Sequence, residues 1–244
     1  MTTAEKLRTI AENEQKVYEA GRKSQYDEFW DALQKNGTRT DYYYGFSGYS
    51  WTAETFKPKY DIRGVRFQST FFVTNTFYGS LIDILNECGV VLDTSQATQI
   101  TTLFGYSGLS DIPHIDCSGL TTLSIGDMFN NCAYLKKIEK ITLKEGVYFG
   151  TNAFNACRSL EEIEFAGVLS TNNVNLQWST KLNKASIVSL IRILSTSTTG
   201  LTITLSKTAV NTAFETSTGA ADGSISQEWG DLIIEKPNWN ISLV

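Results

Sequence analysis

Two segments of this chain superimpose when one is shifted along the other by 25 residues. Each carries a phenylalanine, a cysteine, a leucine and an isoleucine at three-residue intervals, namely Phe129, Cys132, Leu135 and Ile138 in the first segment and Phe154, Cys157, Leu160 and Ile163 in the second. The residues between them differ freely. A repeat behaves in this way when packing fixes its inward positions and leaves its outward positions free. The sequence therefore predicts a solenoid whose turns stack these eight residues into one core.

The repeat extends upstream with some slippage. Phe104 lies 25 residues before the first repeat phenylalanine, and Phe77 lies 27 residues before Phe104. Ser107 occupies the cysteine position, and Leu109-x-x-Ile112 replaces the leucine and isoleucine with one residue deleted. We therefore expect a right-handed solenoid of about four irregular turns.

The spacing of the four core positions resembles that of the BspA-type leucine-rich repeats. The likeness extends to other segments, which resemble parts of such proteins from prophages of gut bacteria, and these segments are Ile10–Asn13, Val17–Lys23, Tyr26–Asp31, Tyr42–Tyr44, Trp51–Ile62, Leu190–Ile193, Leu201–Leu205 and Lys236–Trp239. With the repeats they cover most of the chain. The resemblance implies a leucine-rich-repeat fold and an adhesive or phage-tail-associated role, without a defined ligand.

On these patterns the chain divides into four segments. We predict an N-terminal helical segment at 1–36, an aromatic N-terminal cap at 37–76, the leucine-rich-repeat solenoid at 77–178 and a mixed α/β C-terminal cap at 179–244. The predicted fold class is α+β, rich in strands.

Apolar periodicity predicts the elements of the body and of the C-terminal cap. Strands are expected at 120–125, 141–143, 160–165, 201–205 and 239–243, helices at 187–194 and 208–214, and a Gly/Ser-rich bend at 219–224. Asn131, Gly146 and Gly150 suit the turns between strands, because these residue types accept left-handed backbone conformations.

Each of the two N-terminal segments allows two interpretations. Residues 3–35 carry a narrow helical apolar stripe, which suits a coiled-coil stalk or anchor and equally a helix folded against the first turn. Residues 42–60 are dense in aromatic side chains. These side chains suit a glycan-binding platform, or a cap over the open hydrophobic end that every solenoid must cover.

The cysteines predict buried thiols. Cys132 and Cys157 hold equivalent positions, so their side chains should point the same way on neighbouring turns about 4.8 Å apart. A disulfide tolerates this separation, but parallel side-chain directions give poor disulfide geometry. Cys88 and Cys117 form no Cys-x-x-Cys pair and the chain has one histidine, so no metal site is expected.

Composition excludes several partners. A net charge of −5 over 244 residues, with scattered basic residues, argues against nucleic acid, because phosphate contacts need clustered Lys and Arg. Neither a secretory signal nor an apolar run of about 20 residues is visible, so no membrane insertion is expected. We expect synthesis in the cytoplasm and association with a virion that lysis releases.

The sequence contains no catalytic motif. Gly45–Ser50 and Gly105–Ser110 resemble a nucleophile elbow, but glycine follows the serine directly instead of two residues later. His114 is the only possible histidine base, and its nearest carboxylates in the sequence are Asp111 and Asp116. The carboxylate pairs that could lie at glycosidase distance are Asp111–Asp116 and Glu162–Glu164. We expect no enzyme activity, no catalytic residue and no cofactor.

Two functions remain. The first is recognition of a bacterial surface glycan or protein by the solenoid face, and the second is a structural spacer or attachment module of a virion. Outward residues that differ between matching repeats, such as Tyr134 against Ser159, favour recognition. The expected ligand contacts are Tyr43, Tyr106, Tyr134 and Tyr148. Expected protein partners are other virion or tail subunits and further copies of the chain, joined through residues 1–36, because linked weak sites gain avidity.

Overall fold

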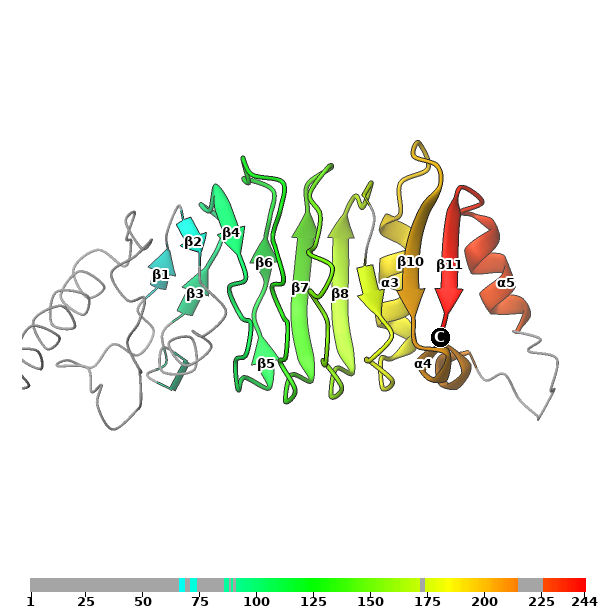
Figure 1. Cartoon of the computed structure of the whole chain (residues 1–244), viewed down its shortest axis with the longest axis horizontal. Coiled ribbons are helices and arrows are strands. Elements are labelled where there is room, and N and C mark those ends of the chain that lie inside the picture. Colours follow the sequence, from blue (N-terminus) through cyan, green and yellow to red (C-terminus); the bar gives the residue numbers. More distant parts are fainter. Residues whose placement is uncertain are drawn as a thin grey trace, which may run out of the picture.

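The computed structural model describes residues 86–87, 89, 91–171, 174–214 and 226–244, together with the backbone of 66–68 and 71–73. Figure 1 shows short strands side by side along the long axis of the molecule, with helices α3 and α5 at the end that holds the C-terminus. The predicted helix at 3–35, the aromatic segment 42–60 with Tyr43, Phe77, Cys88 and the predicted bend at 219–224 lie outside the described residues.

A parallel sheet forms the middle of the molecule. Its strands are β5 (Asp111–Ile112), β6 (Ile115–Asp116), β7 (Lys137–Leu143) and β8 (Glu162–Gly167), with β7 between β8 and the two short strands. Ile138 of β7 lies opposite Ile163 of β8 on one side, at the 25-residue repeat distance, and opposite Ile112 of β5 on the other. The second pair is 26 residues apart, which matches the one-residue deletion in the sequence.

The turns that precede these strands repeat in conformation as well as in sequence. Tyr106, Asn131 and Ala156 have positive φ angles of 64°, 59° and 60°, and they follow one another at intervals of 25 residues. A left-handed conformation costs a residue with a side chain about 1–2 kcal/mol. All three residues adopt this unfavourable conformation at the same position of the repeat, so the backbone path is repeated as well as the sequence.

The repeated apolar side chains lie side by side inside the coil. The rings of Phe104, Phe129 and Phe154 form a continuous stack, with centroids 5.8 Å and then 5.1 Å apart. All eight core residues of the repeat are buried, and they are Phe129, Cys132, Leu135, Ile138, Phe154, Cys157, Leu160 and Ile163. The shared spacing thus corresponds to a shared core, the dominant source of stability in such a body.

Parallel strand pairing starts upstream of residue 77, at separations of 25 and 28 residues. β1 (Arg66–Gln68) pairs with β3 (Val91–Asp93), and β2 (Phe71–Val73) pairs with β4 (Gln99–Thr101). Arg66 lies opposite Val91, 25 residues later. These first strands fall within the segment predicted as the aromatic cap, so that segment contributes backbone to the paired region.

The strand predicted at 120–125 is not formed. Ser124 makes only an isolated bridge, to Tyr148. The amides of Thr121 and Thr122 both donate to the carbonyl of Thr98, as the amides that begin β7 and β8 do to their own shared acceptors, so the turn is kept and only the strand after it is reduced to a bridge. The predicted strands at 141–143 and 160–165 are confirmed in large part, because β7 contains the first and β8 covers most of the second.

Strands and helices alternate in the C-terminal part. The strands are β9 (Val174–Leu176), β10 (Leu201–Leu205) and β11 (Trp239–Leu243), parallel and with β10 in the centre, and the helices are α3 (Lys184–Ile193), α4 (Lys207–Ala213) and α5 (Gln227–Ile234). The helices predicted at 187–194 and 208–214 and the strands predicted at 201–205 and 239–243 are confirmed. A polar side chain caps each helix start, from Asn183, Ser206 and Ser226 respectively.

Helix α3 covers the open edge of the middle sheet. The amide of Ile163 donates to Ser186 Oγ at 2.8 Å, and the amide of Phe165 donates to Ser189 Oγ at 3.1 Å. An uncovered edge strand would present these amides to another chain. The two serines therefore end the strand pairing on this side of β8.

The Lys236–Trp239 segment closes the C-terminal end of α3. The buried Lys236 ammonium donates to the carbonyl of Leu194 at 2.6 Å and to that of Arg192 at 3.1 Å, while Trp239 Nε1 donates to the carbonyl of Ser195 at 2.7 Å. A helix end leaves its last carbonyls unpaired and carries partial negative charge, so a cation is favoured there.

Among the described residues, no helix has the length and apolar character needed to cross a membrane.

Candidate functional site

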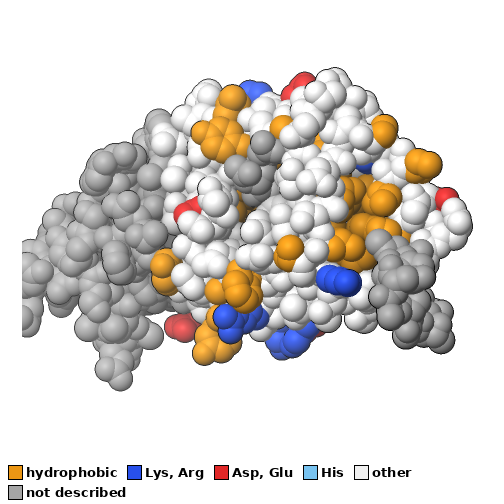
Figure 2. Space-filling model, turned by 45° about the vertical axis from the view of Figure 1, so that its right-hand side comes forward, with side chains coloured by type: hydrophobic (Ala, Val, Ile, Leu, Met, Phe, Trp, Pro, Cys, Tyr) orange, Lys and Arg blue, Asp and Glu red, His pale blue; other side chains and the backbone are white. Residues whose placement is uncertain are grey.

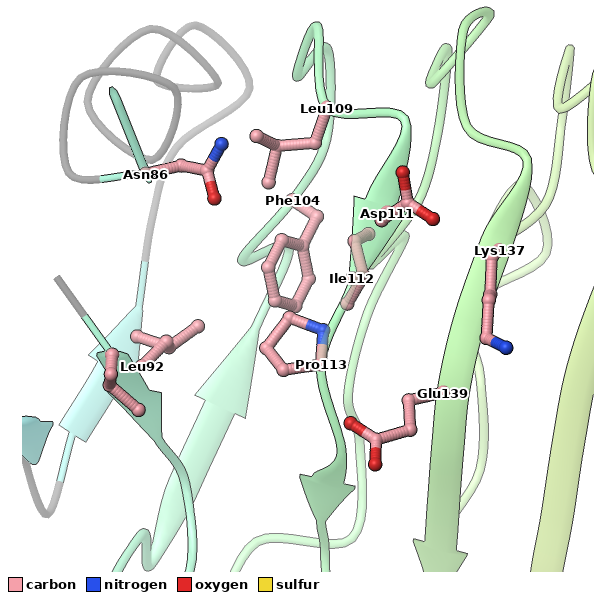
Figure 3. Close-up of a pocket in the computed structure, with 10 residues that line it drawn as sticks. Asn86, Leu92, Phe104, Leu109, Asp111, Ile112, Pro113, Lys137 and Glu139 are labelled. Atoms are coloured by element: carbon pink, nitrogen blue, oxygen red, sulfur yellow. The ribbon is translucent and has the colours of Figure 1, made fainter. Parts of the chain in front are cut away.

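A cleft of about 520 Å³ lies between β3 and the β5–β7 region (Figure 3). Its lining residues are Asn86, Val91, Leu92, Phe104, Leu109, Asp111, Ile112, Pro113, Lys137 and Glu139. Ligand pockets in proteins typically span about 300–1,000 Å³. The cleft is therefore large enough for a small molecule or for a few side chains of a partner.

Pro113 explains why the sheet opens here. Residues 113 and 114 are unpaired between β5 and β6, and Pro113 has no amide hydrogen to donate to a neighbouring strand. β3 pairs with β1, and no described backbone hydrogen bond joins β3 to Pro113 or His114. Beyond this point the two sides are joined, because the amide of Asp116 donates to Thr94 Oγ1 at 2.8 Å. The cleft is thus a local gap between neighbouring strands.

The wall of the cleft is apolar and its rim carries negative charge. Leu109, Ile112 and Phe104 are buried, whereas Asp111 and Glu139 are exposed. In Figure 3 the Glu139 side chain extends from β7 toward the Pro113 segment. The cleft therefore combines an apolar wall with solvent-exposed carboxylates at its rim.

The position of Glu139 follows from an irregularity in the sheet. The pairing of β7 with β8 shifts register between Ile138 and Ile141, so Glu139 and Lys140 together face Glu164 alone. A β-bulge of this kind redirects a side chain and often lies beside a functional site. At the bulge the ammonium of Lys140 lies 2.8 Å from the carboxylate of Glu164, and Glu139 lines the cleft.

Lys137 is the one basic residue among those that line the cleft, and its charge is compensated. Its ammonium lies 2.7 Å from the carboxylate of Glu162 on β8. The hydrogen bond that Lys137 donates to Glu162 raises the pKa of Lys137 above its ordinary value, and the charges of Glu162, Asp111 and Glu139 add to this effect. The rim is therefore negative overall.

A smaller hollow of about 200 Å³ continues the cleft. It shares Val91, Leu92, Pro113 and Glu139 with the cleft and adds Asp93, Thr94, Ser95, His114 and Asp116. Two further carboxylates thus lie along the same gap. We call the cleft and the hollow together the β3 groove.

The three described tyrosines among the predicted ligand contacts do not form one site. Tyr106, Tyr134 and Tyr148 are all exposed, Tyr134 most of all at 71%. Tyr106 and Tyr134 occupy turns before β5 and β7, whereas Tyr148 follows the carboxyl end of β7, beyond a strand of about 20 Å. Tyr148 lies beside the exposed Leu123, whose carbonyl accepts its amide at 2.8 Å.

The residues considered for catalysis have other partners. His114 Nε2 lies 2.9 Å from Thr142 Oγ1. Ser107 is buried, and its hydroxyl accepts the amide of Leu109 at 3.0 Å, which is the role of a turn residue. Glu162 and Glu164 each form an ion pair with a lysine of β7. Within the described part of the chain, no group of three His, Cys, Asp or Glu side chains is placed to hold a metal ion.

The β3 groove was not predicted from the sequence. Its one visible signal was Pro113, which stands between strand-like residues and which a paired central strand does not tolerate. That β3 lies beside Pro113 could not be predicted, because the repeat pattern is irregular upstream of Phe104.

A second exposed surface lies at the C-terminal end. β11 is the outer strand of its sheet as far as the structure describes the chain, and Ile241, Leu243 and Val244 remain partly or fully exposed. Figure 2 shows hydrophobic side chains gathered at this end. An open strand edge of this kind is available for pairing with another chain.

Comparison with protein-family models, with curated proteins and with solved structures finds no match for this chain.

Proposed function

We propose that this protein is a non-enzymatic recognition module that binds a ligand on the bacterial surface. The observation that carries the proposal is the β3 groove, a ligand-sized opening between β3 and the segment where Pro113 interrupts the strand pairing. A glycosidase would need a general acid in apolar surroundings, whereas Asp111 and Glu139 are exposed to water. Binding without bond cleavage fits this arrangement best.

The scaffold of the proposal is a leucine-rich-repeat solenoid of the BspA type. Three features that recur at the same interval support it: the stacked phenylalanines, the left-handed turn residues and the paired isoleucines. Repeat scaffolds expose long surfaces on a rigid core. Such a scaffold would hold the groove and the exposed tyrosines in fixed relative positions.

A phage-tail setting completes the proposal. It rests on the resemblance to prophage proteins and on the expected association through residues 1–36. Display in several copies would raise the avidity of a weak single site by orders of magnitude. The chain would be made in the cytoplasm and carried on the virion, with tail subunits as neighbours.

The second candidate function is a structural spacer or attachment module. The open edge of β11 and its exposed apolar residues favour it, because subunits of an assembly commonly join through such edges. In this case the β3 groove would hold no external ligand.

Cell binding separates the two candidates. The fluorescently labelled full-length chain is incubated with candidate host bacteria, and with the same cells after protease or after periodate treatment. Saturable binding that one treatment abolishes supports recognition and identifies a protein or a glycan ligand. Absence of binding by the assembled multivalent form, together with burial of β11 between virion subunits, would establish the spacer function instead.

A further inference from the structure

We propose that the β3 groove binds an extended protein segment that presents a lysine or arginine next to an apolar side chain. This inference rests on the proposed recognition function and specifies its ligand. The groove offers three matching features, which are an apolar wall, an anionic rim and a strand edge.

The apolar wall selects a side chain with hydrocarbon surface. The apolar surface that a ligand would meet comes from Val91, Leu92 and Pro113, because Leu109 and Ile112 are buried, and the cleft volume of about 520 Å³ has room for a side chain. Phe104 is fully buried, so its ring face is not presented as a platform on which a sugar could stack. An aliphatic or aromatic side chain of a protein therefore fits this wall better than a sugar ring.

The rim selects positive charge. Asp111 and Glu139 stand at the cleft, and Asp93 and Asp116 line the hollow that continues it. The lining lysine is held by Glu162 at 2.7 Å. Because complementary potentials favour encounter and like charges repel, an anionic glycan or an acidic peptide is disfavoured here.

The strand edge selects an extended backbone. In a parallel pair the backbone groups of a strand point alternately toward its partner and away from it. β3 pairs with β1, and Val91 and Leu92 of β3 line the gap beside the segment where Pro113 interrupts the pairing. An extended peptide laid in the gap can bond to this edge and direct alternate side chains to the wall and to the rim.

The test uses the full-length chain and three capped peptides that alternate valine with arginine, with glutamine or with glutamate. Affinities are measured by fluorescence polarisation at low and at high salt. We expect the arginine peptide to bind most tightly and to lose affinity as salt screens the rim. Equal binding of all three peptides, or tighter binding of the glutamate peptide, would overturn the inference.

Variants localise the effect to the groove. Glu139→Lys is expected to weaken the arginine peptide about tenfold, as reversal of a rim charge next to a bound cation does. Glu145→Lys is the matched control, because Glu145 is an exposed glutamate in the turn after β7 that lies outside the groove lining. Thermal unfolding confirms that both variants fold. Equal loss in both variants, or no loss in Glu139→Lys, contradicts the assignment.

The same variants separate this inference from the proposed function. If the wild-type chain binds cells and Glu139→Lys binds them equally well, the recognition function stands and the groove is not its site. If the arginine peptide binds but no cell does, the groove chemistry stands and the recognition function fails.

Discussion

The thiol of Cys157 donates a hydrogen bond to the carbonyl oxygen of Phe129, 28 residues earlier, with sulfur and oxygen 3.1 Å apart. Cys132 makes the same bond to Phe104 at 3.0 Å, again across 28 residues. Each thiol therefore donates to a carbonyl of the preceding turn. A disulfide between the two cysteines would remove both of these S–H donors. Hydrogen bonding as well as packing thus explains a cysteine at this position.

The buried thiols are expected to resist modification in the folded protein. Cys117, Cys132 and Cys157 are free and buried. Burial raises the pKa of Cys157, with a further contribution from Cys132, so the reactive thiolate is scarce. Labelling with a thiol reagent followed by mass spectrometry should show slow reaction at these three sites in native protein and fast reaction in urea. Rapid native labelling would contradict the described burial.

The stability of the fold is expected to fall at alkaline pH because of the same thiols. Burial, and secondarily the charge of Asp116, raises the pKa of Cys117 to about 12, whereas an unfolded thiol titrates near 8.5. The stabilisation from the neutral thiol is complete below about pH 8.5 and is lost as pH rises toward 12. The stability advantage of the wild type over Cys117→Ala should therefore shrink by about 1 kcal/mol between pH 9 and 10. Urea unfolding under reducing conditions measures this, and an advantage that does not change with pH would refute the prediction.

Truncation of a repeat core residue should be costly. Leu160→Ala removes a fully buried side chain from the stacked core, and we expect a loss of about 2–5 kcal/mol in the free energy of unfolding. Tyr134→Ala removes an exposed side chain and should change stability by less than about 0.5 kcal/mol. Chemical denaturation of both variants tests the difference. Similar values for the two would mean that Leu160 does not pack as described.

Lys236 should contribute to stability through its hydrogen bonds to α3. Lys236→Met keeps much of the side-chain volume but removes the donors to Arg192 and Leu194, and we expect a loss of about 1–3 kcal/mol. Lys207→Met is the control, because Lys207 is exposed. Thermal unfolding of the two variants should therefore differ by several degrees, and equal midpoints would show that the carbonyls find other donors.

The sequence predicted those parts of the fold that depend on local periodicity. Phe129 and Phe154 share a spacing that corresponds to one turn of the coil, and Ile187, Leu190 and Ile191 mark the buried face of α3. The serines by which α3 covers β8 were not recognised, because a hydroxyl on a helix has many possible partners.

The candidate site was less accessible to sequence reasoning. Exposed tyrosines such as Tyr134 were easy to propose, but the groove requires that β3, from an irregular part of the repeat, lie beside Pro113. The bulge that redirects Glu139 appears in the sequence only as one extra residue between Ile138 and Ile141 relative to Ile163 and Phe165, and this spacing does not say where the extra side chain points. The shape of the groove therefore depends on long-range packing, which the local sequence pattern does not predict.

The most direct test of the account is to fill the β3 groove and measure cell binding. Val91 is 47% exposed and lines the groove, whereas Val168 is 38% exposed and follows β8, outside the groove lining. Val91→Trp and Val168→Trp add the same bulk at these two places. The account predicts that Val91→Trp weakens binding of the full-length chain to bacteria about tenfold, while Val168→Trp binds as the wild type does. Undiminished binding by Val91→Trp, with both variants folded, would contradict recognition at the groove.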